Sequence, residues 1–218
     1  MLLDYEQAIV DGDLWQRPGL GGRDRSIVTM AILVARGQSD LLPGEFSRAL
    51  DNGVTAAEIS AIITHLAFYA GWGNAVMAAR VAMPLYEARG ITPEMTRVAG
   101  QRRLPLDLAA EDAREANVQQ AHGNTAPGVV DYTRDVLFRD LWLRPELAPR
   151  DRSLVTVSAL VGNGHSAQVG FHLNRAMDNG LSREQASEAL TQMAFYAGWP
   201  NVFSAMSVFG EVFESRTP

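Results

Sequence analysis

The sequence predicts an all-α protein built from two tandem copies of one helical unit. Two observations support this prediction. Short motifs recur at a constant separation along the 218 residues. Within each copy, apolar side chains recur at intervals of three and four residues, which is the spacing of one face of an α-helix. No segment of the sequence shows the strict alternation of apolar and polar residues that is typical of a β-strand.

The repeated motifs indicate an internal duplication. Residues 23–26 match residues 150–153, and the two segments lie 127 positions apart. The same separation relates residues 13–18 to 140–145, 51–53 to 178–180, and 67–72 to 194–199. Identity that keeps one register over this length, without a gap, indicates that one half arose by duplication of the other.

Capping signals mark where the helices begin and end. Residues 55–58 (Thr-Ala-Ala-Glu) and 182–185 (Ser-Arg-Glu-Gln) have the spacing of a capping box, in which two side chains satisfy free backbone N–H groups at a helix N-terminus. The Asn-Gly pairs at 52–53 and 179–180 predict helix ends, because glycine tolerates the left-handed conformation that follows the last turn.

Four helices are therefore expected in each copy. Their predicted ranges are 24–37, 40–52, 56–70 and 73–88, and again 151–164, 167–179, 183–197 and 200–214. Residues 27–35 are apolar on every side, so this helix is expected to be central or to face another subunit.

The chain divides into a first unit (1–90), a linker (91–128) and a second unit (129–218). The linker contains proline and glycine and few apolar residues, which predicts an exposed segment with a short helix near 108–120.

Charge and composition exclude several classes of protein. The net charge is −6 without a Lys/Arg block, so no nucleic-acid partner is expected. No apolar run approaches the ~20 residues that cross a bilayer, and the acidic start MLLDYEQAIVDGD does not resemble a signal peptide, which favours the cytoplasm. The absence of cysteine removes disulfides, thiolate zinc sites and thiol nucleophiles.

The second copy carries a set of motifs in a fixed order: residues 140–145 (Asp-Leu-Trp-Leu-Arg-Pro), 150–153 (Arg-Asp-Arg-Ser), 171–173 (Phe-His-Leu), 178–180 (Asp-Asn-Gly) and 196–201 (Tyr-Ala-Gly-Trp-Pro-Asn). This set resembles a carboxymuconolactone decarboxylase unit. The resemblance extends over both copies. It implies an alkylhydroperoxidase D-like all-α fold, assembly into ring-shaped homo-oligomers (a dimer or trimer of two-unit chains) with pockets between units, and cofactor-free decarboxylation of a carboxylated muconolactone to an enol-lactone.

The redox branch of the same superfamily, the alkylhydroperoxidase D-like proteins, carries Cys-x-x-Cys-x-x-x-His. When that histidine is placed on His172, His165 and Gln168 stand where the cysteines would be. The first copy has Gln38, Leu41 and Glu45 there. Thiol peroxidase chemistry is therefore not expected.

His172 is the leading candidate for the chemistry. It belongs to a stripe of polar residues spaced by three or four, namely His165, Gln168, His172, Arg175 and Asn179. Such a stripe can simply be the solvated side of a helix. The resemblance favours a catalytic role for His172, because an imidazole with a pKa near neutrality can protonate a carbanion-like carbon.

An arginine is the expected partner of the substrate's negative charge. Loss of CO₂ from a carbon conjugated to a lactone carbonyl places charge on the carbonyl oxygen, which needs a cationic or hydrogen-bonding stabiliser. A guanidinium can also grip a second carboxylate bidentately. Arg152 is the candidate and Arg25 its counterpart; the alternative for both is a structural ion pair with a neighbouring Asp or Glu.

The two copies differ at two informative positions. His172 corresponds to Glu45, and His65 corresponds to Gln192. We hypothesise that His65 of one unit and His172 of the other complete one site where the units meet, while the reciprocal pair of Glu45 and Gln192 has decayed or uses Glu45 as a base. Independent drift of two surface positions is the alternative.

The remaining candidates are weaker. The Tyr-Ala-Gly-Trp corners at 69–72 and 196–199 fit core packing, or else Tyr196 and Trp199 wall the substrate pocket together with Arg25, His165 and Gln168. No metal is expected, because His165 and His172 are two turns apart and no acidic residue completes a set nearby. No Gly-rich phosphate loop follows a strand, so no nucleotide cofactor is implied.

The sequence therefore predicts a cofactor-independent lyase for a small carboxylated lactone of the 4-carboxymuconolactone type or a related organic acid. Two alternatives stay open at this point. One is different enolate chemistry, such as that of an isomerase, a dehydratase or an aldolase, on a specialised metabolite. The other is a non-catalytic helical binding or assembly protein, because a fold alone does not determine a reaction.

Overall fold

The computed structural model describes residues 1–97 and 102–216. Within these ranges the chain forms eleven α-helices, connected in places by short 3-10 and π-helical segments, and no β-strand. The expected all-α class is confirmed. None of the helices in the described ranges is both long enough and apolar enough to cross a membrane.

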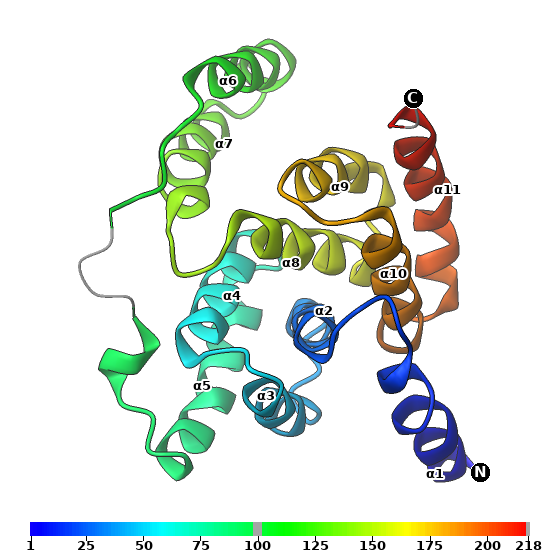
Figure 1. Cartoon of the computed structure of the whole chain (residues 1–218). Helices are drawn as coiled ribbons and strands as arrows, with labels where there is room; N and C mark the ends of the chain where they lie inside the picture. The colour runs from blue at the N-terminus through cyan, green and yellow to red at the C-terminus, as the bar shows by residue number, and fades with distance from the viewer. Residues whose placement is uncertain (98–101, 217–218) are drawn as a thin grey trace.

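The main helices repeat in the same order in the two copies (Figure 1). Those of the first copy are α2 (Gly22–Ala35), α3 (Leu42–Asp51), α4 (Ala56–Tyr69) and α5 (Trp72–Ala88). Those of the second copy are α8 (Pro149–Gly162), α9 (Val169–Asp178), α10 (Arg183–Ala197) and α11 (Trp199–Ser215). Short segments precede each set: α1 (Leu2–Tyr5), a π-helix (Glu6–Asp11) and a 3-10 turn (Leu14–Gln16), and then α7 (Pro127–Tyr132), a π-helix (Thr133–Phe138) and a 3-10 turn (Leu141–Leu143).

Helices α2 and α8 pack against each other at the centre of the molecule (Figure 1). Residues 24–35 and 151–162 are all buried. This confirms the central position predicted from the all-round apolar run. Reciprocal ion pairs join the starts of the two helices, Arg23 with Asp151 at 2.7 Å and Arg150 with Asp24, as expected for two copies related by a pseudo-two-fold axis.

Each copy packs its capping-box helix against the central helix of the other copy. Helix α4 lies against α8, and α10 lies against α2. The two copies are therefore interlocked, and the chain contains two related junctions between them. These junctions carry the residues that differ between the copies.

The predicted caps are present. Thr55 and Ser182 each accept a hydrogen bond from the backbone N–H three residues later, and the side chains of Glu58 and Gln185 accept from the cap residues in return. The predicted helix ends are confirmed at Gly53 and Gly180, whose φ angles of 88° and 100° lie in the left-handed region.

The structure corrects two predicted boundaries. Helix α9 begins at Val169, because Gly164 (φ 75°) ends the preceding turn and residues 166–168 form a separate 3-10 turn. Helix α7 begins at Pro127, inside the predicted linker, because proline is well suited to the first turn of a helix.

The linker contains a longer helix than expected, α6 (Leu108–His122), and a 3-10 turn at Pro93–Thr96. Most of α6 is exposed, with Glu111 as its buried residue. Its Arg114 lies over the ring of Phe138, 4.0 Å from the ring centroid. The linker helix is thus anchored on the second copy rather than free in solvent, and it lies beside α7 (Figure 1).

Candidate active site

The junction between α4 and α8 brings together side chains from distant parts of the chain. They are His65 and Tyr69 of α4, Trp142 of the 3-10 turn before α8, Arg152 of α8 and His172 of α9, and we call this set the histidine junction. The rings of His65 and Tyr69 stack at 4.6 Å between centroids, and those of Trp142 and His172 stack at 5.7 Å. The structure therefore places His65 and His172 in one cluster within a single chain.

His65 is completely buried and its hydrogen bonds define its protonation. Its Nε2 lies 2.7 Å from the Thr156 hydroxyl oxygen, and that hydroxyl donates to the Arg152 carbonyl at 2.9 Å. Nε2 must therefore carry the proton and donate, which leaves Nδ1 to accept from the Arg152 guanidinium at 3.3 Å. Burial, followed by the charge of Arg152, lowers the pKa of His65 well below its usual value, so the ring is neutral.

His172 is also buried, with 9% of its surface exposed. Its Nδ1 has no hydrogen-bond partner among the described residues. Burial, with a further contribution from Arg175, lowers the pKa of His172 to about 4. The expectation of a pKa near neutrality was therefore wrong, because the sequence does not reveal how deeply the ring is buried.

Arg152 is a buried cation without an ion-pair partner. It is 1% exposed, and within the described ranges no carboxylate lies within 4.0 Å of its guanidinium. One Nη donates to the Arg144 carbonyl at 2.8 Å, while Nε has no partner there. Burial lowers the pKa of Arg152 to about 10, and the charge of Glu146 acts in the opposite direction. An anion that reached this guanidinium would find an unsatisfied donor.

Aromatic side chains and a second arginine complete the histidine junction. The Trp142 indole N–H donates to the Tyr69 hydroxyl at 2.9 Å, and burial raises the pKa of Tyr69 to about 12. Arg175 lies over the Trp142 ring, 4.3 Å from its centroid. Sequence reasoning assigned no site role to Trp142, Arg175 or Thr156. The recurrence of the tryptophan in both Asp-Leu-Trp motifs was the available signal.

Two open pockets border this cluster. One, of about 880 Å³, is lined by Ala57, Ala61 and Thr64 of α4, by Arg97, and by Arg144, Glu146 and Arg152. The other, of about 630 Å³, lies between the linker helix and α9 and is lined by Arg114, Phe138, Trp142, Phe171 and Arg175. Arg152 forms part of the wall of the first pocket, and Trp142 and Arg175 form part of the wall of the second.

The reciprocal junction, between α10 and α2, has the same layout with different chemistry. Its residues are Trp15, Arg25, Glu45, Gln192 and Tyr196, and we call this set the glutamate junction. The Trp15 indole donates to the Tyr196 hydroxyl at 3.0 Å, as Trp142 does to Tyr69. Gln192 accepts from Arg25 at 3.0 Å and donates to the Thr29 hydroxyl at 3.1 Å. The amide thus replaces the imidazole in the same chain of hydrogen bonds.

Two residues of the glutamate junction, Arg25 and Glu45, are charged. Arg25 is fully buried and forms an ion pair with Glu188 at 3.2 Å. A structural ion pair was the alternative interpretation for both Arg25 and Arg152. In the described ranges it is present at Arg25 and not at Arg152. Glu45 lies 3.7 Å from Arg48, and one of its carboxylate oxygens has no hydrogen-bond partner in the described ranges. Burial raises the pKa of Glu45 above its usual value.

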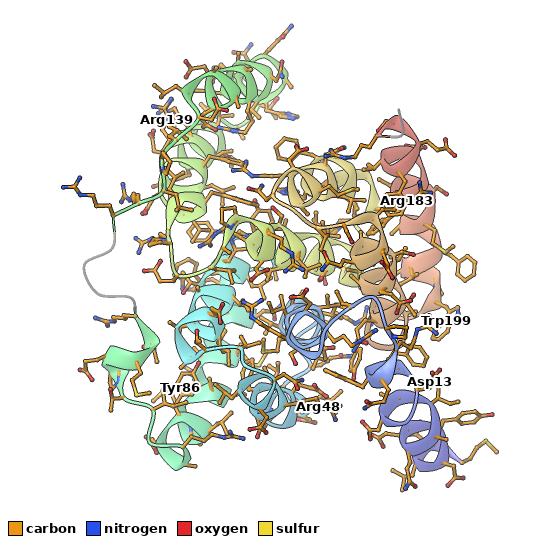
Figure 2. The ribbon with its side chains drawn as sticks, in the orientation of Figure 1. Asp13, Arg48, Tyr86, Arg139, Arg183 and Trp199 are labelled. Carbon is orange, nitrogen blue, oxygen red and sulfur yellow. The ribbon has the colours of Figure 1, made fainter. Side chains whose placement is uncertain are left out.

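Three predicted site residues lie apart from both junctions. His165 and Gln168 are exposed and precede α9, so the single helical stripe that joined them to His172 is wrong. Trp199 is 51% exposed, packs on Phe195 at 5.1 Å, and lies at the edge of the molecule (Figure 2). Tyr196 does line a junction, but the one without histidine. In the described part of the chain, no group of three or more acidic or histidine side chains is arranged to hold a metal ion.

The fold and its site define a class: a helical protein with two interlocked copies and a buried Arg–His pair at one junction between them. The carboxymuconolactone decarboxylase family matches residues 3–83 and 127–211, which is most of the chain. The chain belongs to this family, as a tandem two-unit member.

Two curated relatives agree with this assignment. A 4-carboxymuconolactone decarboxylase of Acinetobacter baylyi is 39% identical over 83 residues, which are 38% of this chain and 62% of the relative. A nitrosuccinic acid decarboxylase of Metarhizium robertsii is 28% identical over 102 residues, which are 47% of this chain and 71% of the relative. The chain thus spans less than two thirds of the first relative's length.

Proposed function

We propose that the protein is a cofactor-independent lyase that removes CO₂ from a small carboxylated lactone or a comparable organic acid, with the histidine junction as its active site. The observation that supports this most directly is Arg152, a buried guanidinium with an unused donor at the wall of a pocket. The names of both relatives, each a decarboxylase, favour the same reaction class.

The proposed reaction breaks the bond between the substrate carbon and its carboxylate. The bonding electrons move into the conjugated carbonyl and form an enolate or dienolate, while CO₂ departs. A cation near the carbonyl oxygen lowers the energy of this state more than that of the substrate, which is the condition for catalysis. Arg152 and Arg175, each in the wall of one of the two pockets, supply positive charge.

His172 then delivers a proton to the carbanion-like carbon. The ring is neutral at pH 7 before substrate binds, because its pKa is about 4. A bound polyanionic substrate raises this pKa, since an opposite charge nearby favours the imidazolium. The proton enters from solvent when the substrate binds, passes to carbon after CO₂ leaves, and is replaced from solvent in the next cycle.

His65 acts as a positioning residue in this scheme. Both of its ring nitrogens are engaged, one with Arg152 and the other with Thr156, so it holds the guanidinium rather than exchanging a proton. We propose that the glutamate junction has no part in the reaction, because Arg25 is already neutralised by Glu188.

An assay of CO₂ release from 4-carboxymuconolactone tests the proposal. Release that depends on His172 supports it. Consumption of the lactone without CO₂, with solvent deuterium incorporated into carbon, would point to isomerase-type enolate chemistry instead. A non-catalytic binding protein would show no turnover, and His172→Ala and Arg152→Ala would leave its ligand binding and association unchanged.

We also propose that the chain forms a homo-oligomer. Apolar side chains are exposed at matching places on the two outer helices, Trp72 and Val76 on α5 and Trp199 and Phe203 on α11. Burial of such patches against a second copy removes apolar surface from water. Light scattering coupled to size exclusion should show a dimer or trimer, and Phe203→Glu should shift it toward the monomer.

A further inference from the structure

Beside the glutamate junction, the carboxylate of Glu188 is bound by two arginines, Arg17 and Arg25. Glu188 of α10 binds Arg17 through both oxygens, at 2.7 and 3.1 Å, and binds Arg25 at 3.2 Å. The carboxylate is partly buried, with 15% of its side chain exposed, and the two guanidinium groups replace part of its hydration with charge-assisted hydrogen bonds. This part of the molecule therefore shows how a carboxylate is held at the central arginine of a junction.

At the histidine junction, Arg144 and Arg152 correspond to Arg17 and Arg25, but no carboxylate corresponds to Glu188. The residue at the position of Glu188 is Ala61, which lines the pocket of about 880 Å³ together with Arg144 and Arg152. Arg144 occupies the place of Arg17, and its carbonyl accepts from Arg152 at 2.8 Å, just as the Arg17 carbonyl accepts from Arg25 at 2.8 Å. The frame of the carboxylate site is thus conserved between the copies while its occupant is missing.

Arg144 can turn toward a bound carboxylate at little cost, although it is paired with Asp140 in this structure. Its guanidinium now pairs with Asp140 at 3.0 and 3.2 Å, with about half of its side chain exposed. Exposed pairs of this kind contribute little, on the order of 0–1 kcal/mol. Asp140 would keep a partner when Arg144 leaves, because Arg103 lies 3.1 Å from the same carboxylate.

We infer that Arg144 and Arg152 form a subsite for one carboxylate of the substrate, which sits over Ala61 in the place that Glu188 fills in the other copy. This inference rests on the proposed function and names its substrate class: a molecule with at least two acidic groups. The carboxylate bound here is the one that stays. Two cations on the departing carboxylate would stabilise the ground state, in which that group is charged, and so slow the loss of CO₂.

Glu146 indicates a further feature of the substrate. It lines the same pocket, stands where the first copy has Gly19, and has a buried carboxylate oxygen without a partner in the described ranges. It is not within 4.0 Å of Arg152 in the described structure, so it does not occupy the subsite. A ligand with a hydroxyl or another donor beside its retained carboxylate would satisfy this oxygen.

The experiment builds the missing carboxylate into the protein. Ala61→Glu should reproduce the clasp of Glu188, and Ala61→Gln is the control of equal size without charge. The probe is succinate, whose binding is measured by calorimetry on the whole chain. We expect Ala61→Glu to weaken succinate binding at least about 30-fold and Ala61→Gln by less than about fivefold. Arg144→Gln should weaken it about tenfold, with a larger effect on KM than on kcat in the CO₂ assay.

The reciprocal variant tests the same idea from the other side. Glu188→Ala removes the built-in carboxylate, and succinate should then bind at two sites instead of one, with CO₂ release unchanged. Equal succinate affinity in the wild type, Ala61→Glu and Arg144→Gln overturns the inference, as does the absence of wild-type binding at about 10 mM. If succinate affinity changes in these variants as expected but no variant releases CO₂, the subsite is supported and the proposed function is wrong. If Ala61→Glu still releases CO₂ at the wild-type rate, the proposed function is supported and the subsite is wrong.

Discussion

The two junctions share one framework and differ in how the charge of the central arginine is balanced. Arg25 has a complete set of partners: two backbone carbonyls, the Gln192 amide and the Glu188 carboxylate. Arg152 has one backbone carbonyl and the His65 ring, and its Nε is unused. The glutamate junction thus balances the charge of its central arginine with a carboxylate of the same chain, whereas no described carboxylate does so at the histidine junction.

The comparison also supports the assignment of the His65 proton to Nε2 rather than Nδ1. A glutamine side chain offers one acceptor and one donor, and Gln192 turns its oxygen to Arg25 and its nitrogen to Thr29. Neutral imidazole with the proton on Nε2 offers the same pair in the same directions. The two copies therefore support one assignment independently.

The largest expected effect separates the junctions by activity. His172→Gln removes the proposed proton donor and should lower kcat for CO₂ release about 10²–10⁴-fold. The matched variant Glu45→Gln, at the same position of the other copy, should change kcat by less than about threefold. A comparable loss in both variants would show that both junctions catalyse.

The second prediction tests the positioning role of His65. His65→Gln recreates the arrangement of Gln192 and should lower kcat/KM only about three- to tenfold, because the hydrogen bonds to Arg152 and Thr156 remain. His65→Ala leaves Arg152 with one fewer partner and should cost at least about 100-fold. If glutamine proves as damaging as alanine, His65 exchanges a proton after all.

The third prediction concerns acid stability. His172 has a pKa of about 4 in the folded chain and near 6.5 when unfolded, so the unfolded chain binds more protons between these values. The free energy of unfolding should therefore fall as the pH drops from 6.5 to 4, by up to roughly 3 kcal/mol from this group. Urea unfolding at several pH values should show a shallower fall for His172→Gln. Parallel curves for the two proteins would contradict the burial of a neutral ring.

The smallest expected effect has the opposite sign. Because burial raises the pKa of Glu45, the folded chain holds this proton more tightly than the unfolded chain does. Its contribution to stability is complete below pH 4.5 and is lost as the pH rises through the folded pKa. Glu45→Gln should stabilise the chain at pH 7 by about 1 kcal/mol or less, and the gain should vanish near pH 4. A gain that is equal at both pH values would rule out this explanation.

Most of the fold was predictable because its signals are local and occur twice. Capping boxes, Asn-Gly stops and an all-round apolar helix each have one straightforward structural interpretation, and the constant register of the duplication confirms each signal in a second copy. The juxtaposition of His65 and His172 was also predictable, from the loss of one histidine in each copy. Their roles stay a prediction.

The rest of the site depends on burial and long-range packing, which sequence spacing does not reveal. Gly164 breaks the helical phase, and this removes His165 and Gln168 from the group around His172. The lowered pKa of His172 follows from burial against the rings of Tyr69 and Trp142, which lie in two other segments, and from the nearby charge of Arg175. The choice between ligand site and ion pair was open for both arginines, although a comparison of Ala61 with Glu188 would have separated them.

The Glu188 clasp has a consequence for how this architecture can evolve. In a symmetric assembly of identical single-copy subunits, every seam must carry the same residues, so a substitution that strengthens one seam alters all of them. Covalent tandem fusion lifts this restriction. One interface between the copies can then hold an internal ion pair that stabilises the molecule. The other interface can tolerate an unneutralised cation, which in a symmetric assembly would destabilise every interface.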